Sequence, residues 1–222
     1  MRPFARAFAV PALVALAGCA TYSGAPGPAA PAPTFQAGDQ FVFHVEDGFR
    51  LKTIWDETHT ITAKGPTVDD ARVELWSSPG VVVSGAVFDN ETRRFEPPLI
   101  RYRYPLNVGD HWQQRMRDAL HDSRPYGGIE RDVRVRGYEK VTTPAGTFDA
   151  MRLDVFMRLD DETFWRHATE CAYTIWYAPT LGVAVREVKY AWYYEKGGSM
   201  DGVARIPSQN ARVELVAYSR TR

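Results

Sequence analysis

Hydrophobic and polar residues alternate with a period of two along most of this chain. Phe41, Phe43 and Val45 place three large apolar side chains on one face of an extended segment, with polar residues between them. Asp47-Gly48 follows, a dipeptide typical of tight hairpin turns, and a second alternating run begins at Phe49. This pattern predicts β-strands with one buried face, because side chains in a helix would repeat every three to four residues.

Turn-forming residues divide the rest of the chain into short runs rich in Val, Thr, Tyr and Trp. The dividing residues are Asn90, Pro97-Pro98, Pro144-Ala145-Gly146, Pro179 and Gly197-Gly198. Strands joined by such short connections pair antiparallel with their neighbours, because parallel strands need long crossovers. The sequence therefore predicts an all-β fold with one curved antiparallel sheet.

One segment, residues 110–122, fits two interpretations. Trp112, Met116 and Ala119 recur at helical spacing after Asp110, which could cap a short helix. The same residues also fit a strand that alternates irregularly. We favour the strand and keep one short helix as the alternative.

The chain also repeats short motifs. Ala-Arg-Val-Glu-Leu occurs at residues 71–75 and again at 211–215, and residues 151–155 have the same pattern. A Gly-Asp-polar-aromatic element occurs at residues 38–41 and at 109–112. Such recurrence is typical of an internal duplication. The alternative is that a half-buried strand with Arg and Glu outward is a common solution used several times.

The N-terminus differs in kind from the rest of the chain. Arg2 and Arg6 carry positive charge, and residues 7–17 form an uncharged apolar run that is too short to span a bilayer. Leu16-Ala17-Gly18-Cys19 resembles the lipobox of bacterial lipoproteins. The resemblance implies that residues 1–18 are a signal peptide, that cleavage falls between Gly18 and Cys19, and that lipid is attached to Cys19.

Residues 19–34 follow as the lipidated cysteine and a tether rich in Pro, Ala and Gly, and residues 35–222 as one β-sheet domain. A proline-rich tether extends about 3.1 Å per residue, so it could hold the domain up to about 45 Å from the membrane. Ala20 stands where an Asp would retain a Gram-negative lipoprotein at the inner membrane. We therefore expect a lipid-anchored protein of the cell envelope, at the outer membrane and facing the periplasm.

Charge and cysteine content narrow the classes further. The chain has 27 basic and 27 acidic residues, and no basic face that would suggest nucleic acid. Hydrophobic residues make up 45% of the chain, enough for a core. Of the two cysteines, Cys19 is committed to lipid, so we expect Cys171 to be a buried, unbridged thiol.

Several segments of the second half together resemble the TapB-like group of bacterial secreted proteins and lipoproteins. They are Pro-Leu-Asn-Val-Gly-Asp-His-Trp (105–112), Thr-Pro-Ala-Gly-Thr within 137–150, Trp-Tyr-Ala-Pro within 175–183, and the closing 214–218. The resemblance implies an open, strongly curved sheet similar to the half-barrel of bacterial lipoprotein carriers. It implies no catalytic residues, since the shared motifs are turns and aromatics.

A search for catalytic or metal-binding patterns finds little. The five histidines are scattered, and His167 and Cys171 would lie about 13 Å apart in a strand, so we expect no metal and no cofactor. Asp160-Asp161-Glu162 has the setting of a hairpin tip. Paired carboxylates of a glycosidase type stay open, because no one pair stands out.

Aromatic residues are the strongest remaining signal. Tyr190, Trp192 and Tyr194 share one face of a predicted strand, and Trp176 lies in the preceding one. We take these four as a candidate surface for a ligand or a protein partner, against the alternative of ordinary cross-strand packing. The resulting hypothesis is a lipoprotein, not an enzyme, that binds a lipid or acyl chain on a curved sheet. The alternatives are an assembly scaffold that docks another envelope protein and a hydrolase of envelope polymers.

Overall fold

The computed structural model describes residues 24–49, 52–88, 91–119, 128–196 and 204–221. These residues form thirteen strands and no α-helix, so they contain no helix that could span a membrane. The strands of the first half are β1 (Gln40–Asp47), β2 (Lys52–Thr62), β3 (Gly65–Val68), β4 (Arg72–Val73), β5 (Leu75–Ser78), β6 (Val81–Gly85) and β7 (Arg93–Ile100). Those of the second half are β8 (His111–Asp118), β9 (Gly128–Thr143), β10 (Gly146–Leu159), β11 (Thr169–Ala178), β12 (Val183–Tyr194) and β13 (Arg205–Ser219). The all-β prediction is confirmed.

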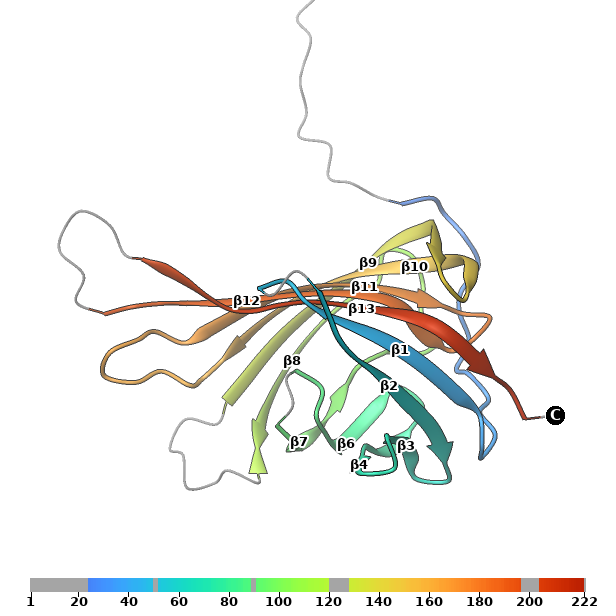
Figure 1. Cartoon of the computed structure of the whole chain (residues 1–222). Coiled ribbons are helices and arrows are strands. Elements are labelled where there is room, and N and C mark those ends of the chain that lie inside the picture. The colour runs from blue at the N-terminus through green and yellow to red at the C-terminus, as the bar shows by residue number, and fades with distance from the viewer. Residues whose placement is uncertain (1–23, 50–51, 89–90, 120–127, 197–203, 222) are drawn as a thin grey trace, which may run out of the picture.

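The strands form one antiparallel sheet in the order β4-β3-β2-β1-β13-β12-β11-β10-β9-β8-β7-β6-β5. The first strand pairs with the last, from Gln40 opposite Ser219 to Asp47 opposite Ala211, which curls the sheet on itself (Figure 1). The two edge strands, β4 and β5, are joined by the single residue Glu74, and the backbone N–H of Trp76 in β5 donates to the carbonyl of Lys64, just before β3, at 2.8 Å. The sheet therefore curves further than a half-barrel and forms a nearly closed barrel.

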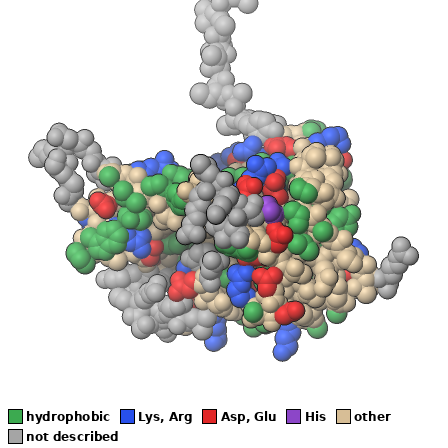
Figure 2. Space-filling model, in the orientation of Figure 1, with side chains coloured by type: hydrophobic (Ala, Val, Ile, Leu, Met, Phe, Trp, Pro, Cys, Tyr) green, Lys and Arg blue, Asp and Glu red, His purple; other side chains and the backbone are tan. Residues whose placement is uncertain are grey.

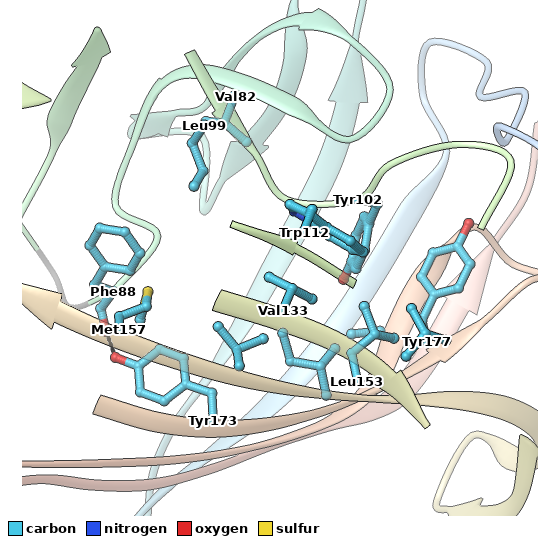
Figure 3. Packing of buried hydrophobic residues seen from close by; sticks show 14 of the residues in the cluster. Val82, Phe88, Leu99, Tyr102, Trp112, Val133, Leu153, Met157, Tyr173 and Tyr177 are labelled. Carbon is cyan, nitrogen blue, oxygen red and sulfur yellow. Dashed lines mark hydrogen bonds between the residues drawn. The ribbon is translucent and has the colours of Figure 1, made fainter. Parts of the chain in front are cut away.

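Alternation along each strand decides which side chains fill the barrel. In β9, Ile129, Val133 and Val135 are buried inside, while Glu130 and Arg134 between them are exposed. The inward residues of β8 to β11 pack together into the main core, as Figure 3 shows for Trp112, Val133 and Leu153 among others. Burying such apolar surface is the main stabilising contribution of the barrel wall.

Residues 111–118 form a strand, as we favoured, and not a helix. Trp112 and Met116 are 6% and 3% exposed and face the core, while His111, Gln113 and Arg115 face outward. The spacing of the apolar residues fitted both a helix and a strand. Backbone pairing with β9, from His111 opposite Arg134 to Arg117 opposite Gly128, makes this segment a strand. Residues 120–122 lie outside the described part of the chain.

The Gly-Asp element folds the same way in both halves. Gly38 and Gly109 have φ values of +94° and +90°, which glycine adopts without strain. The Asp39 carboxylate accepts the backbone N–H of Gln36 at 2.9 Å, and the Asp110 carboxylate accepts that of Asn107 at 2.8 Å. The sequence repeat is thus also a repeat of structure, with β1–β2 corresponding to β8–β9.

The next turn repeats as well. Thr62 and Thr143 each accept, through Oγ1, the backbone N–H two residues on at 3.2 Å, and the turns end at Gly65 and Gly146 with φ of +131° and +136°. The identical copies at 71–75 and 211–215 do not follow this correspondence. The former spans β4 and the start of β5, whereas the latter lies in β13.

The segment predicted to be a free tether packs against the barrel from Gly24 onward. Ala25 pairs with Tyr138, Ala30 pairs with Leu106 and is 1% exposed, and the Tyr138 hydroxyl donates to the carbonyl of Pro28 at 2.8 Å. Small residues allow this contact, because a side chain at Gly27 would collide with the Tyr138 ring. We call residues 24–34 the N-terminal strap.

Candidate functional site

A cavity of about 190 Å³ lies inside the barrel. Its apolar wall comes from both halves of the sheet and comprises, among others, Phe41, Phe43, Ile61, Val82, Phe88, Val155, Met157, Tyr173, Ile175 and Ala184. Figure 3 shows Phe88, Met157 and Tyr173 close together, with the Tyr173 hydroxyl donating to the Phe88 carbonyl at 3.2 Å. The strap reaches the cavity too, since Pro33 is among its lining residues.

Tyrosines supply part of the cavity wall. Tyr102 and Tyr104 line it, and Tyr104 donates to the hydroxyl of Tyr177 at 2.9 Å. Burial raises the pKa of Tyr177 to about 12 and raises the pKa values of Tyr102 and Tyr104 further. All three hydroxyls are therefore neutral near pH 7 and can serve as hydrogen-bond donors.

Charged residues also line the cavity, and most of them form ion pairs. Arg72 binds Glu57 at 2.8 Å, Arg101 binds Glu74 through both carboxylate oxygens at 2.9 and 2.7 Å, and Lys189 binds Glu187 at 3.0 Å. Each carboxylate thus has a cation within reach, which is the condition for keeping a charge in a partly buried place.

Glu57 sits in the densest of these contacts. Its carboxylate accepts the indole N–H of Trp55 at 2.7 Å and lies 3.3 Å from His59 Nε2. Burial raises its pKa, but hydrogen bonds from His59, Arg72 and Trp55 outweigh burial and lower the pKa to about 2. Glu57 is therefore ionised over the whole neutral range.

Arg131 is the exception among the lining cations. Its side chain points inward from β9 between Ile129 and Val133 and is 5% exposed. It donates to the carbonyl of Ile100 at 2.7 Å and, more weakly, to that of Arg101 at 3.4 Å, and within the described residues no carboxylate forms an ion pair with it. Burial and the neighbouring Arg101 lower its pKa to about 10, so it is still protonated at pH 7.

The predicted aromatic surface does not line this cavity. Trp176 faces the outside of the barrel, where its indole N–H donates to Glu139 at 2.8 Å. Tyr190 and Trp192 stack on each other at 5.4 Å, with the Arg205 guanidinium 3.9 Å from the Trp192 ring. Tyr194 is half-buried near the end of β12. The structure thus brings Tyr190 and Trp192 together and leaves Trp176 apart from them.

Cys171 and Asp161, two other residues that the sequence analysis considered, are held in contacts within the fold. Cys171 is buried at 1% exposure and forms no disulfide. Asp161 accepts the backbone N–H of Thr169 at 2.7 Å and pairs with Arg166 at 2.9 Å, so it organises the β10–β11 connection. Over the described ranges no three His, Cys, Asp or Glu side chains gather as metal ligands would. Gly18 and Cys19 lie outside the described residues.

Sequence reasoning missed the charged lining of the barrel. A signal for Arg131 does exist, because it occupies an apolar-face position in the alternating run Ile129-Glu130-Arg131-Asp132-Val133. An inward charge in such a strand is a departure that function often explains. No comparable signal marks Glu74 or Arg101, because the strands around them are short.

Comparisons with known proteins give the following. No family model matches the sequence, and no match is found among curated proteins. Among solved structures, a Bacteroides fragilis protein assigned as exported, with a YmcC-like fold, is 15% identical with a TM-score of 0.43, over 87% of this chain and 100% of that one. A Parabacteroides distasonis protein assigned as a lipoprotein is 14% identical with a TM-score of 0.42, over 85% and 97%. The resemblance to the TapB-like group stays a prediction.

Proposed function

We propose that this chain is a lipid-anchored protein of the bacterial cell envelope that binds an apolar ligand, a lipid or an acyl chain, and performs no chemistry. The observation that carries the proposal is the cavity inside the barrel, with its mainly apolar wall. The ligand would lie within the curved sheet and not on the outer aromatic surface predicted from the sequence.

The size of the cavity supports a ligand. Protein interiors are close-packed, and spaces larger than a water molecule are few. One water molecule needs about 10–15 Å³ of cavity space, so about 190 Å³ has room for a ligand of about a dozen non-hydrogen atoms. Binding sites for small molecules are typically concave, mostly apolar and equipped with a few polar groups, which describes this cavity.

We propose that a ligand enters the cavity at the seam where the two ends of the sheet meet. β4 and β5 follow each other in the chain and are joined by Glu74, and this segment is held against β3 and the turn before it by two backbone hydrogen bonds, Trp76 to Lys64 at 2.8 Å and Glu74 to Pro66 at 2.9 Å. Beside this seam, Val73 lines the cavity and is still 48% exposed. Short edge strands with few hydrogen bonds open more readily than long paired ones, so the seam is the proposed opening.

The N-terminal strap would hold the barrel close to the membrane. Because the strap is bound from Gly24, only residues 20–23 separate it from the predicted lipid on Cys19. Five residue steps span at most about 18 Å, much less than the 45 Å that a free tether would allow. The strap begins beside Gly137 and Tyr138, so this end of β9 would face the membrane, at the outer membrane on its periplasmic side.

A cavity-blocking substitution tests the proposal. The whole chain, carrying Cys19→Ala to prevent lipidation, would be titrated with a fluorescent apolar probe and then with an unlabelled fatty acid as competitor. We expect Ala184→Trp, inside the barrel, to abolish probe binding, and the matched Ala172→Trp, on the outer face of β11, to leave it unchanged. Equal binding by both folded variants would overturn the proposal, as would no binding by the unsubstituted barrel.

The scaffold alternative has one observation in its favour. Phe164, in the connection between β10 and β11, is 92% exposed, and Trp165 beside it is 41% exposed. Hydrophobic side chains gather at the end of the molecule where β12 and β13 project (left in Figure 2). If this end docks another envelope protein, Phe164→Ser should reduce capture of that partner from intact envelopes without changing probe binding.

A further inference from the structure

The charges that line the cavity do not balance. Four cations line it, Arg72, Arg101, Arg131 and Lys189, against three carboxylates, Glu57, Glu74 and Glu187. Each carboxylate belongs to an ion pair with a different cation. Arg131 is therefore left without a counter-charge in contact, and Glu187 acts on it only at longer range.

A buried positive charge without a partner is costly. Removing a guanidinium from water is repaid only by close charge pairing and hydrogen bonds, and Arg131 has two backbone carbonyls in place of a carboxylate. Leu, Ile or Val at this position would continue the apolar pattern of β9 at no such cost. The charge is thus a departure from what the barrel needs in order to fold.

The guanidinium still has donors to offer a ligand. Of its five N–H groups, the described contacts use two, for Ile100 and Arg101. The hydroxyl of Tyr102 lies within electrostatic range of Arg131, lines the same cavity, and has no hydrogen-bond partner among the described residues. A planar guanidinium beside a neutral hydroxyl suits an anionic group with two or three oxygens.

We propose that the ligand is an amphiphile with an anionic headgroup, whose oxygens bind Arg131 and Tyr102 while its alkyl tail lies along Val155, Met157 and Ile175. This inference rests on the proposed function and adds the chemistry of the headgroup. A carboxylate and a phosphate share that chemistry, and a single alkyl chain fits the size of the cavity.

The test compares ligands with the same tail and different headgroups. Calorimetric titration of the Cys19→Ala chain with decanoate, decyl phosphate and decanol would give three affinities. We expect the better of the two anions to bind about tenfold or more tightly than decanol, since hydrogen bonds to charged groups contribute more than neutral ones. The preferred anion tells a carboxylate headgroup from a phosphate headgroup.

Variants of β9 locate the preference. Arg131→Met should bring the anions and decanol to equal affinity, and Arg131→Lys, which keeps the charge but not the fork of donors, should retain part of the preference. Arg134→Met, three residues on and on the outer face, is the matched control and should leave all affinities unchanged. Because Arg131→Met removes a lone buried charge, it should not lower the midpoint of thermal unfolding.

The outcomes separate the two proposals. Equal binding of decanoate, decyl phosphate and decanol by the unsubstituted chain would overturn the headgroup inference and leave the binding function standing. An anion preference that survives Arg131→Met would overturn the assignment to Arg131. No binding of any of the three to the folded chain would overturn both.

Discussion

The two halves of the barrel have corresponding turns and strands, but they differ in strand length and in the residues that they contribute to the core and the cavity. In the second half, β9 to β13 have 10 to 16 residues each, and their inward faces carry most of the buried wall. In the first half, β3 to β6 have two to five residues each, and two of the three ion pairs of the cavity come from this half.

This difference indicates a division between a stable half and a half where the barrel closes. Long strands with continuous apolar faces make the second half the stable frame, because burial and backbone pairing reinforce each other along their length. Short strands with charged side chains make the first half the place where the barrel closes, and we propose that the cavity is reached there. Matched substitutions in the two halves test this division.

The largest contrast should come from leucine truncation. Leu153 in β10 is fully buried, whereas Leu75 in β5 is 37% exposed. We expect Leu153→Ala to lower the free energy of unfolding by about 2–5 kcal/mol, and Leu75→Ala by about 0.5 kcal/mol. Urea unfolding followed by tryptophan fluorescence would measure both, and equal losses would contradict the division.

A second contrast concerns the corresponding turn glycines. At Gly146 a Cβ atom would meet nothing closer than 3.7 Å, so Gly146→Ala should cost only the backbone strain at φ +136°, about 1–3 kcal/mol. At Gly65 the Cβ atom would lie 2.2 Å from the carbonyl oxygen of Glu74, across the seam. Gly65→Ala should therefore lower the free energy of unfolding by more than Gly146→Ala does. It should also speed hydrogen exchange of the Trp76 amide, which donates to the carbonyl of Lys64 beside Gly65.

That second readout separates strain from opening of the seam. If Gly65→Ala and Gly146→Ala lose the same stability, and the Trp76 amide exchanges at its original rate in both, the seam does not depend on the close approach of Gly65 to Glu74.

The smallest contrast concerns the repeated aspartates. Asp39 is fully buried, accepts the backbone N–H groups of Gln36 and Thr221, and lies 3.1 Å from the Arg220 guanidinium. Asp110 is half-buried and accepts hydrogen bonds mainly from Asn107. We expect Asp39→Ala to cost about 1–3 kcal/mol, because two backbone N–H groups and a guanidinium lose their buried acceptor, and Asp110→Ala about 0.5–1.5 kcal/mol.

Asp39 also predicts a dependence on pH. Burial raises its pKa, but hydrogen bonds from Gln36 and Thr221 and the charge of Arg220 outweigh burial and lower it. Its contribution is then complete above the pKa of the unfolded chain and is lost as the pH falls through the folded value. Unfolding midpoints of the unsubstituted chain and of Asp39→Asn should converge in acid, and a constant gap down to pH 2 would contradict this.

Alternation and turn residues were enough to predict much of the frame. Phe41, Phe43 and the hairpin around Pro144 to Gly146 lie where the pattern placed them, because each depends on neighbours within a few residues. The near-closure of the barrel was not predictable in this way. It depends on pairing between β1 and β13, which are separated by most of the chain.

The site was harder to predict than the frame. Aromatic clustering pointed to Tyr190 and Trp192, but a period of two gives the two faces of a strand without saying which one lines a cavity. The strap was missed because its composition is that of a linker, and its pairing with Tyr138 and Leu106 joins residues far apart in the sequence. The charged lining comes from strands in both halves that only the folded sheet brings together.

Photo-crosslinking would test the central claim, that the ligand lies inside the barrel, most directly. The Cys19→Ala chain would be irradiated with a decanoic acid that carries a diazirine on its tail, and the labelled residues would be mapped by mass spectrometry. Neighbouring residues of β10 face opposite sides, with Val155 and Met157 in the cavity wall and Phe156 46% exposed outside. Labelling of Val155 or Met157 that excess decanoate prevents is the predicted result. Labelling confined to Phe156 or Phe164 would place the ligand on the outer surface and contradict the account.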